Sequence, residues 1–197
     1  MTLQTKENTI AILFTVVAIG FNLWYMGLTV IFLNIGLGVS LILWLNFKKN
    51  YRKGLSWLYM AGILIQLTHF LEEYYTGFYK VLPLIFNENP WTRVQFLIFN
   101  IIWFIIFLLA AIGSFKNIRL SFLVVWFFIL IGSVGNGIMH IGLSLSRKEY
   151  FPGTGTAFIL FFIGLIMLKN ITSSSITIGN RQSRKKLCRD IGQDREI

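Results

Sequence analysis

No acidic or basic residue occurs between Ile10 and Phe47, and this constrains the fold more than any other feature of the chain. A helix that crosses the hydrocarbon of a bilayer needs about 20 apolar residues, within a range of about 17–25. The uncharged stretch is too long for one such helix. We therefore predict two spanning helices, over residues 10–26 and 28–46, with a tight reversal near Gly27. A single true span in this stretch stays open as the alternative.

The rest of the sequence continues the same pattern. Hydrophobic residues make up 55% and charged residues 13% of the chain, whereas a soluble domain carries about 25% charged residues. Further apolar stretches predict spans over residues 54–79, 94–115, 120–145 and 154–169. The expected fold is an all-α polytopic transmembrane helical bundle over residues 1–169, with about six helices, or five if residues 10–46 hold one span. A longer loop is expected over 80–93, and the basic tail over 170–197 is expected to be disordered or to lie on the lipid surface.

Most of the 18 Lys and Arg residues fall on one side of this arrangement, in the loop over 48–53, the turn over 116–119 and the tail. Because cytoplasmic loops are enriched in basic residues, we expect both termini in the cytoplasm. The net charge of +10 is then a topology signal, and no nucleic-acid partner is predicted. Since Cys188 is the single cysteine, neither a disulfide framework nor a cysteine metal site is expected. The chain is expected to be a multi-pass protein of a prokaryotic cell membrane, and its first helix to be retained, because no clear cleavage site follows the first apolar run.

Glu72 and Glu73 are the only charged residues within the apolar part of the predicted third span. An ionised carboxylate in hydrocarbon costs on the order of several kcal/mol, so such residues mark functional sites by default. His69 precedes them by three and four residues, which places all three side chains on neighbouring positions of one helix face. Gln66, one turn earlier, and Thr76 extend this polar stripe. The stripe is the strongest functional signal in the sequence.

A second, narrower polar stripe consists of Asn136 and His140 in the predicted fifth span, where residues four apart share a face. At about 1.5 Å rise per residue, His69 and His140 come to comparable depth toward the external ends of two parallel helices. Asn100, near the outer end of the fourth span, falls at the same level. A shared site of these groups and the paired glutamates is therefore geometrically feasible.

Two imidazoles and two carboxylates favour a divalent metal such as zinc, since a catalytic zinc takes three protein ligands, often two His and one Glu. His69, His140 and either Glu72 or Glu73 could supply this set, and the remaining glutamate could accept a proton from the bound water. Asn136 is a further candidate catalytic residue. The spacing H-x-x-E-E differs from the H-E-x-x-H pattern of zinc proteases, so the inference rests on chemistry. Alternatively, the glutamates reach water at the helix end and the histidines only satisfy helix–helix hydrogen bonds.

The segment before the last span, residues 150–156, is predicted on the same external side as the acids. Pro152 and Gly153 set a sharp re-entry into the membrane, and Thr154 or Thr156 is expected to cap the last helix. A role in lining the site is compatible with capping. The predicted lining of the site consists of Gln66, Asn100, Tyr150, Pro152, Gly153 and Thr156.

Three motifs occur in order along this region: H-x-x-E-E at residues 69–73, a pattern similar to N-A-x-x-H at 136–140, and Y-x-P-G-x-x-T at 150–156. Together they resemble the HXXEE-motif family of integral membrane proteins, over about residues 55–170. Gly137 stands where the family pattern has alanine, which is a small-for-small change. The family is described by its motifs, and membership implies no particular activity. The resemblance implies functional importance for His69, Glu72, Glu73, Asn136, His140, Tyr150, Pro152, Gly153 and Thr156.

The predicted function is that of a membrane-embedded enzyme, a metal-dependent hydrolase acting on a lipid or other apolar substrate near the outer leaflet. Carboxylates and imidazoles in a low-dielectric pocket favour an enzyme, because such surroundings tune pKa values for catalysis. Two alternatives stay open, namely a metal-free isomerase that shuttles protons between the same groups and a small proton- or cation-coupled transporter. Membrane lipids and an apolar small molecule are the expected partners. The sequence carries no signal for the oligomeric state.

Overall fold

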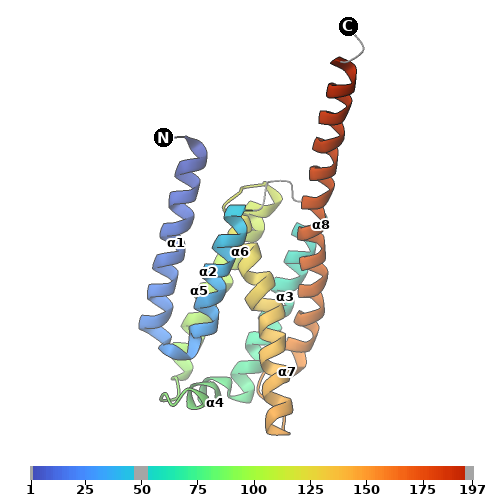
Figure 1. Ribbon diagram of the computed structural model, residues 1–197. Coiled ribbons are helices and arrows are strands. Elements are labelled where there is room, and N and C mark those ends of the chain that lie inside the picture. The colour runs from blue at the N-terminus through green and yellow to red at the C-terminus, as the bar shows by residue number, and fades with distance from the viewer. Residues whose placement is uncertain (1, 47–52, 194–197) are drawn as a thin grey trace.

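The computed structural model describes residues 2–46 and 53–193, with side chains over 2–46 and 54–173, and within these ranges it contains helices and no strands. The elements in chain order are α1 (Leu3–Met26), the 3-10 helix η1 (Leu28–Val30), α2 (Ile31–Asn46), α3 (Lys53–Thr76), α4 (Phe78–Ile85), α5 (Arg93–Phe115), α6 (Ser121–Phe127), the π-helix η2 (Phe128–Gly135), α7 (Asn136–Arg147) and α8 (Thr154–Gln193). Figure 1 shows their arrangement as a bundle.

The predicted all-α polytopic bundle is confirmed, with six candidate membrane spans among the described residues. The uncharged N-terminal stretch divides at Gly27, whose φ of 75° lies in the left-handed region that glycine adopts without strain. Glu88, in the loop before α5, accepts hydrogen bonds from the backbone N–H groups of Leu28 at 2.7 Å and Thr29 at 3.3 Å. These N–H groups begin the second span and have no partner within their own helix. The stretch therefore forms a hairpin of two spans, and the single-span alternative is wrong.

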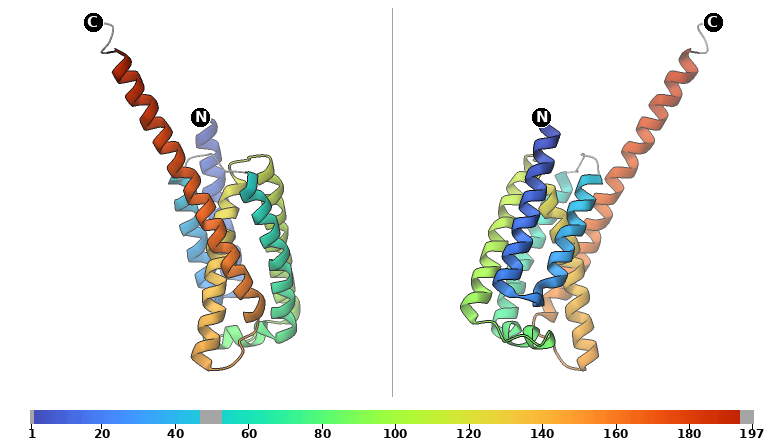
Figure 2. Two further views of the ribbon diagram at one scale, coloured as in Figure 1. Left: turned by 90° about the vertical axis from the view of Figure 1, so that its right-hand side faces the viewer. Right: turned by 60° about the vertical axis from the view of Figure 1, so that its left-hand side comes forward.

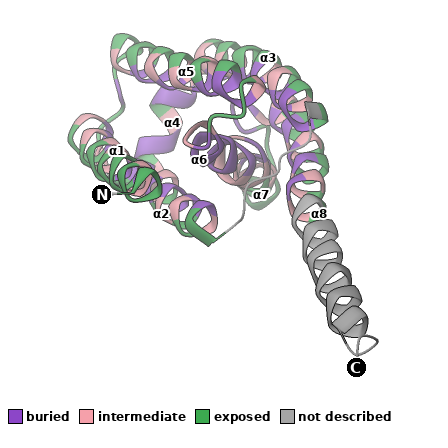
Figure 3. Ribbon diagram, turned by 90° about the horizontal axis from the view of Figure 1, so that it is seen from above, coloured by how far each residue is buried: buried purple, intermediate pink, exposed green. Residues whose placement is uncertain are grey.

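A central column formed by α6, η2 and α7 organises the bundle (Figure 3). α2, α5 and α8 pack against this column, and α3 packs against α5 and α8. Every residue of α6 after Ser121 is buried, as expected for a helix that is apolar on all sides. The N-terminal end of α1 and the C-terminal end of α8 lie at one end of the bundle, and α4 lies at the other (Figures 1 and 2).

The third span ends earlier than expected, and α4 occupies much of the predicted loop. α3 stops at Thr76 because Gly77, with a φ of 85°, breaks the helix. α4 then begins at Phe78 and contains Pro83. Because proline has no N–H group, it leaves the carbonyl of Tyr79 free, and that carbonyl accepts a hydrogen bond from the N–H of Trp91 at 3.0 Å. This bond fastens the following loop to α4 and closes that end of the bundle.

The fifth span, predicted over 120–145, runs over Ser121–Arg147 and has η2 at its centre. A π-helical turn carries i→i+5 hydrogen bonds and is frequent at functional sites. Because each of these hydrogen bonds spans one residue more than in an α-helix, η2 rotates the face that all following residues of the span present. Gly36 of α2 lies against η2, where an added Cβ would be 2.0 Å from Ile131 Cγ1. A side chain at residue 36 would thus force α2 away from the central column.

The last helix continues beyond the span predicted over 154–169. The backbone of α8 is helical as far as Gln193, and its candidate span covers Thr154–Ser173. The side chains after Ser173 lie outside the described part of the chain. The expectation that the basic tail over 170–197 is disordered or rests on the lipid surface stays a prediction.

Candidate functional site

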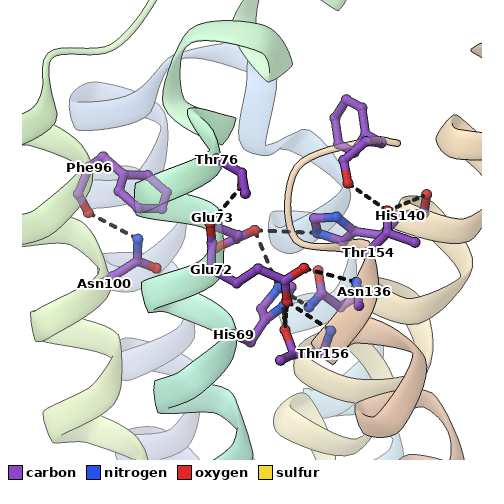
Figure 4. A network of polar contacts seen from close by, with 12 residues as sticks. His69, Glu72, Glu73, Thr76, Phe96, Asn100, Asn136, His140, Thr154 and Thr156 are labelled. Atoms are coloured by element: carbon purple, nitrogen blue, oxygen red, sulfur yellow. Dashed lines mark hydrogen bonds and ion pairs between the residues drawn. The ribbon is translucent and has the colours of Figure 1, made fainter. Parts of the chain in front are cut away.

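His69 and Glu73 of α3 and His140 of α7 meet in one buried cluster (Figure 4). Glu73 Oε1 lies 3.3 Å from His69 Nε2 and 3.3 Å from His140 Nε2. The two imidazole rings stand edge to face, with their centroids 4.9 Å apart. The structure thus brings together both histidines of the chain and one of the two paired glutamates. We call these three residues the triad.

Hydrogen bonds indicate which nitrogen of His69 carries the proton. Thr156 donates its hydroxyl hydrogen to Glu72 Oε2, so its oxygen is free to accept the proton of His69 Nδ1, which lies 2.9 Å away. His69 Nε2 then holds a lone pair and accepts a hydrogen bond from Asn136 Nδ2 at 2.7 Å. Histidines that bind metals usually donate through their second nitrogen in this way, which fixes the tautomer and the ring orientation. Nε2 of His69 is therefore the ligand atom on offer, and a metal bound there would replace the hydrogen bond from Asn136.

Glu72 is engaged by the first turn of α8. Its carboxylate accepts four hydrogen bonds, from the backbone N–H groups of Gly155 at 2.9 Å and Thr156 at 2.8 Å and from the hydroxyls of Thr156 and Tyr150. The first N–H groups of a helix lack partners within the helix, and a carboxylate beside them is stabilising. Sequence reasoning left either glutamate as the metal ligand, and only Glu73 lies against both imidazoles. Glu72 instead fastens α8 and the preceding loop to α3.

Tyr150 lies in the loop between the last two spans and is more than half exposed. Burial of its hydroxyl, together with the hydrogen bond to Glu72, raises the pKa of Tyr150 to about 12. The hydroxyl therefore remains a hydrogen-bond donor to Glu72 throughout the physiological pH range.

His140 is held by two aromatic rings and by the backbone at Gly153. Phe78 stacks on the imidazole with centroids 5.2 Å apart, and the centroid of Phe151 lies 5.6 Å away. Gly153 has a φ of 90°, and an added Cβ would lie 2.7 Å from His140 Cε1 and 2.9 Å from Glu73 Cγ. Among the described residues, His140 Nδ1 has no hydrogen-bond partner, and the Glu73 carboxylate at 3.3 Å is the polar contact of Nε2. Buried polar atoms are normally satisfied, so the unpartnered Nδ1 and the long contact of Nε2 leave His140 with capacity to bind a further group.

The remaining residues of the loop support the triad without joining it. Pro152 is buried, and Thr154 Oγ1 donates to the carbonyl of Phe151 at 2.6 Å and lies 2.8 Å from Ser144 Oγ. Sequence reasoning missed the two rings that hold His140. Phe151 falls within the Y-x-P-G-x-x-T motif, which was a usable signal. Phe78 begins α4, and no pattern in the sequence marks it.

An apolar cavity of about 810 Å³ adjoins the triad, and its walls come from α2, α3, α4, α5, η2 and α7. This volume is in the upper part of the range of about 300–1,000 Å³ found for small-molecule sites. His69, Glu73 and Gln66 contribute polar groups to the wall. Asn100 also lines the cavity, but its Nδ2 donates to the carbonyl of Phe96 at 3.0 Å, and it is not part of the triad (Figure 4).

The triad has the donor atoms and the spacing of a metal site. Tetrahedral ligands on bonds of about 2.0–2.1 Å stand roughly 3.3 Å apart, and Glu73 Oε1 is 3.3 Å from each imidazole Nε2. One ligand atom from each residue lies within 4.8 Å of the others. Two His and one Glu form a set that catalytic zinc takes, with a fourth position left for water or substrate. The residues present therefore fit a divalent metal such as zinc.

Six apolar helices and a buried His/Glu/His cluster define a multi-pass membrane protein with a candidate metal site. Residues 57–168 match the sequence profile of the family described as "Protein of unknown function with HXXEE motif". The chain belongs to this family, and the resemblance seen in its motifs is confirmed. No curated protein and no solved structure matches the chain.

Proposed function

We propose that this protein is a membrane-embedded, metal-dependent hydrolase that acts on a lipid or another apolar substrate. The observation that carries the proposal is the direct contact between the triad and the apolar cavity, since His69 and Glu73 belong to both. An enzyme of this kind needs a polar reacting centre at the wall of a site that takes an apolar molecule. The triad lies on α3 and α7, and both helices also line the cavity.

In this proposal His69, Glu73 and His140 would hold the metal. When bound there, it would supply a Lewis acid and lower the pKa of bound water to about 7. Asn136 Nδ2 lies 2.7 Å from His69 Nε2 and is placed to orient a polar group that approaches the triad. Phe78 and the other apolar residues of the cavity wall exclude bulk water, which strengthens the electrostatic interactions inside.

Glu72 acts as a positioning residue in this mechanism. All four of its hydrogen bonds go to the loop and to α8, so it is not free to take a proton from water. Glu72 helps to orient His69 through the hydroxyl of Thr156, which donates to Glu72 and accepts from His69 Nδ1. In the hydrolysis itself, the oxygen of water bonds to the acyl carbon, and the bond from that carbon to the leaving oxygen or nitrogen breaks. One water proton goes to the leaving atom, and the other is released with the acid.

A metal-free isomerase is the second candidate, and one observation favours it. Glu73 Oε1 lies 3.3 Å from both imidazoles, so a proton can pass between the carboxylate and either ring with little movement. Such a chain of groups could take a proton from one carbon of an apolar substrate and return it to another. This function needs the same cavity and the same three residues.

Elemental analysis of the detergent-purified protein separates the two functions. We expect about one zinc or similar ion per chain in the wild type, and a loss of that ion in His140→Ala and Glu73→Gln. The matched control is Glu149→Gln, because Glu149 is an exposed acid outside the triad and is paired with Arg147. Hydrolysis of a fluorogenic long-chain acyl ester should follow metal content across these four proteins. A metal-free wild type that still hydrolyses the ester would exclude the metal-dependent mechanism, and one that only exchanges carbon-bound protons of an apolar ketone would favour the isomerase.

A further inference from the structure

The cavity beside the triad reaches the lipid-facing surface between α2 and α7. Phe32 and Ile35 of α2 and Ile138 of α7 all line it, and they are 62%, 55% and 60% exposed. In a membrane these positions face hydrocarbon and not water, because α2 and the α6–α7 column are spans. A ligand therefore enters sideways from the bilayer, with its apolar part first in contact with these three side chains.

The charges on the cavity wall restrict the ligand further. Among the described residues that line the cavity, Glu73 is the one acid, and none is Lys or Arg. In the protein without a metal, as in the presence of EDTA, a phosphate group in this cavity would lie near a carboxylate without a cation to neutralise it, which is strongly unfavourable at low dielectric. The volume of about 810 Å³ suits one hydrocarbon chain with a small head better than a two-chain lipid. The cavity thus favours an uncharged, single-chain amphiphile.

Gln66 adds a specific polar contact to this apolar wall. The residue is 3% exposed, and its Oε1 has no hydrogen-bond partner in the part of the chain that the structure describes. It lies one helical turn before His69, so the two side chains share a face of α3, with Cβ atoms about 5–6 Å apart. A hydroxyl group both donates and accepts hydrogen bonds, and it therefore satisfies the amide in either orientation.

We infer that the substrate is an uncharged single-chain lipid with a hydroxyl group close to its acyl ester or amide bond, and that Gln66 binds this hydroxyl. The chain occupies the cavity, the hydroxyl meets Gln66, and the acyl carbonyl lies at the triad. Gln66 thereby selects hydroxylated amphiphiles over plain hydrocarbons, and the Glu73 carboxylate disfavours phosphate-bearing lipids in the metal-free protein. This inference rests on the proposed function for the reaction, whereas the binding that it predicts needs no metal.

Photolabelling of the full chain in detergent with a diazirine analogue of hexadecylglycerol tests the inference. This ether cannot be hydrolysed, and EDTA is present, so binding is measured whether or not the protein is a metalloenzyme. In the wild type we expect unlabelled hexadecylglycerol to compete about tenfold better than hexadecane. Lysophosphatidic acid with the same chain should compete no better than hexadecane. Labelled peptides should come from α2 and from η2–α7.

Two pairs of variants make the test specific. Gln66→Met should abolish the tenfold preference, whereas Ser133→Ala should keep it, because Ser133 Oγ is also buried without a partner among the described residues but lies outside the cavity lining. Removing an unsatisfied buried polar atom does not destabilise a protein, so both variants should fold. Ile35→Trp should slow labelling at least severalfold, and Ile42→Trp should not, since Ile42 is equally exposed two turns along α2 but does not line the cavity.

The outcomes keep this inference apart from the proposed function. Unchanged preference in Gln66→Met, or competition by lysophosphatidic acid equal to that by hexadecylglycerol, would overturn the inference even if the protein proves to be a metal-dependent hydrolase. Conversely, a metal-free protein that shows the full tenfold preference supports the binding role of Gln66 and removes only the hydrolase.

Discussion

Replacing Gly153 with alanine should destabilise the protein through the triad. A non-glycine residue at a φ of 90° costs about 1–2 kcal/mol. The new Cβ would lie 2.7 Å from His140 Cε1 and 2.9 Å from Glu73 Cγ, and overpacking of this kind costs about 1–3 kcal/mol. The ring of His140 cannot move aside easily, because Phe78 and Phe151 pack against it. The two contributions together predict a loss of roughly 2–5 kcal/mol in the free energy of unfolding.

Unfolding in detergent micelles, followed by near-UV circular dichroism against increasing SDS, measures this loss. Gly142→Ala is the matched control, since Gly142 lies in α7 two residues after His140 and an added Cβ there meets no atom within 4 Å. The control should gain up to about 1 kcal/mol from its better helix propensity. In a His140→Ala background the effect of Gly153→Ala should shrink, because the vacated space accommodates the new methyl group. A Gly153→Ala protein as stable as the wild type would show that the loop does not press on the triad.

Thr156→Val should lower zinc affinity about 10–100-fold, because His69 Nδ1 loses its acceptor and the tautomer is no longer fixed. Competition with a chelator measures this affinity. The control Thr76→Val should bind zinc as the wild type does, because the hydroxyl of Thr76 donates to the backbone carbonyl of Glu72 and not to the triad. Glu88 makes the stability of the protein depend on pH. Burial raises the pKa of Glu88, but the hydrogen bonds from the hydroxyl of Thr29 and from two backbone N–H groups outweigh it and hold the pKa below 4.5. Because the folded-state pKa is lowered, this stabilisation is present above about pH 4.5 and is lost as the pH falls through the lower value. The melting temperature of the wild type should therefore drop on acidification to a greater extent than that of Glu88→Gln, and equal pH profiles would contradict the role of Glu88 as a cap.

The spans could be predicted because they depend on local composition, although one or two spans over residues 10–46 stayed open. An uncharged run must lie in hydrocarbon, and a glycine such as Gly27 is where such a run can reverse. The end of α3 and the presence of α4 could not be predicted in this way. They depend on Gly77 and on the pairing of Trp91 with the carbonyl that Pro83 leaves free, and this pairing exists only when two segments meet.

The residues of the triad could be singled out for a similar reason. Buried charge is costly in a membrane, so His69, Glu73 and His140 stood out from an apolar background. The different roles of Glu72 and Glu73 did not follow from spacing, because the two residues are adjacent and both border His69. Phe78, which stacks on His140, could not be singled out from the sequence, because aromatic residues are frequent throughout such a chain.

By itself, the sequence determined that the protein is a helical membrane protein of five or six spans and that its buried acids and imidazoles mark a candidate site. The cost of placing polar groups in lipid can be estimated for each residue separately. Only the tertiary structure decided that Glu73 joins both histidines while Glu72 caps α8, and that the site adjoins an apolar cavity. These outcomes depend on how α3, α7 and α8 pack around the π-helical turn of η2. Packing of that kind is a property of several segments together and is not encoded in any one of them.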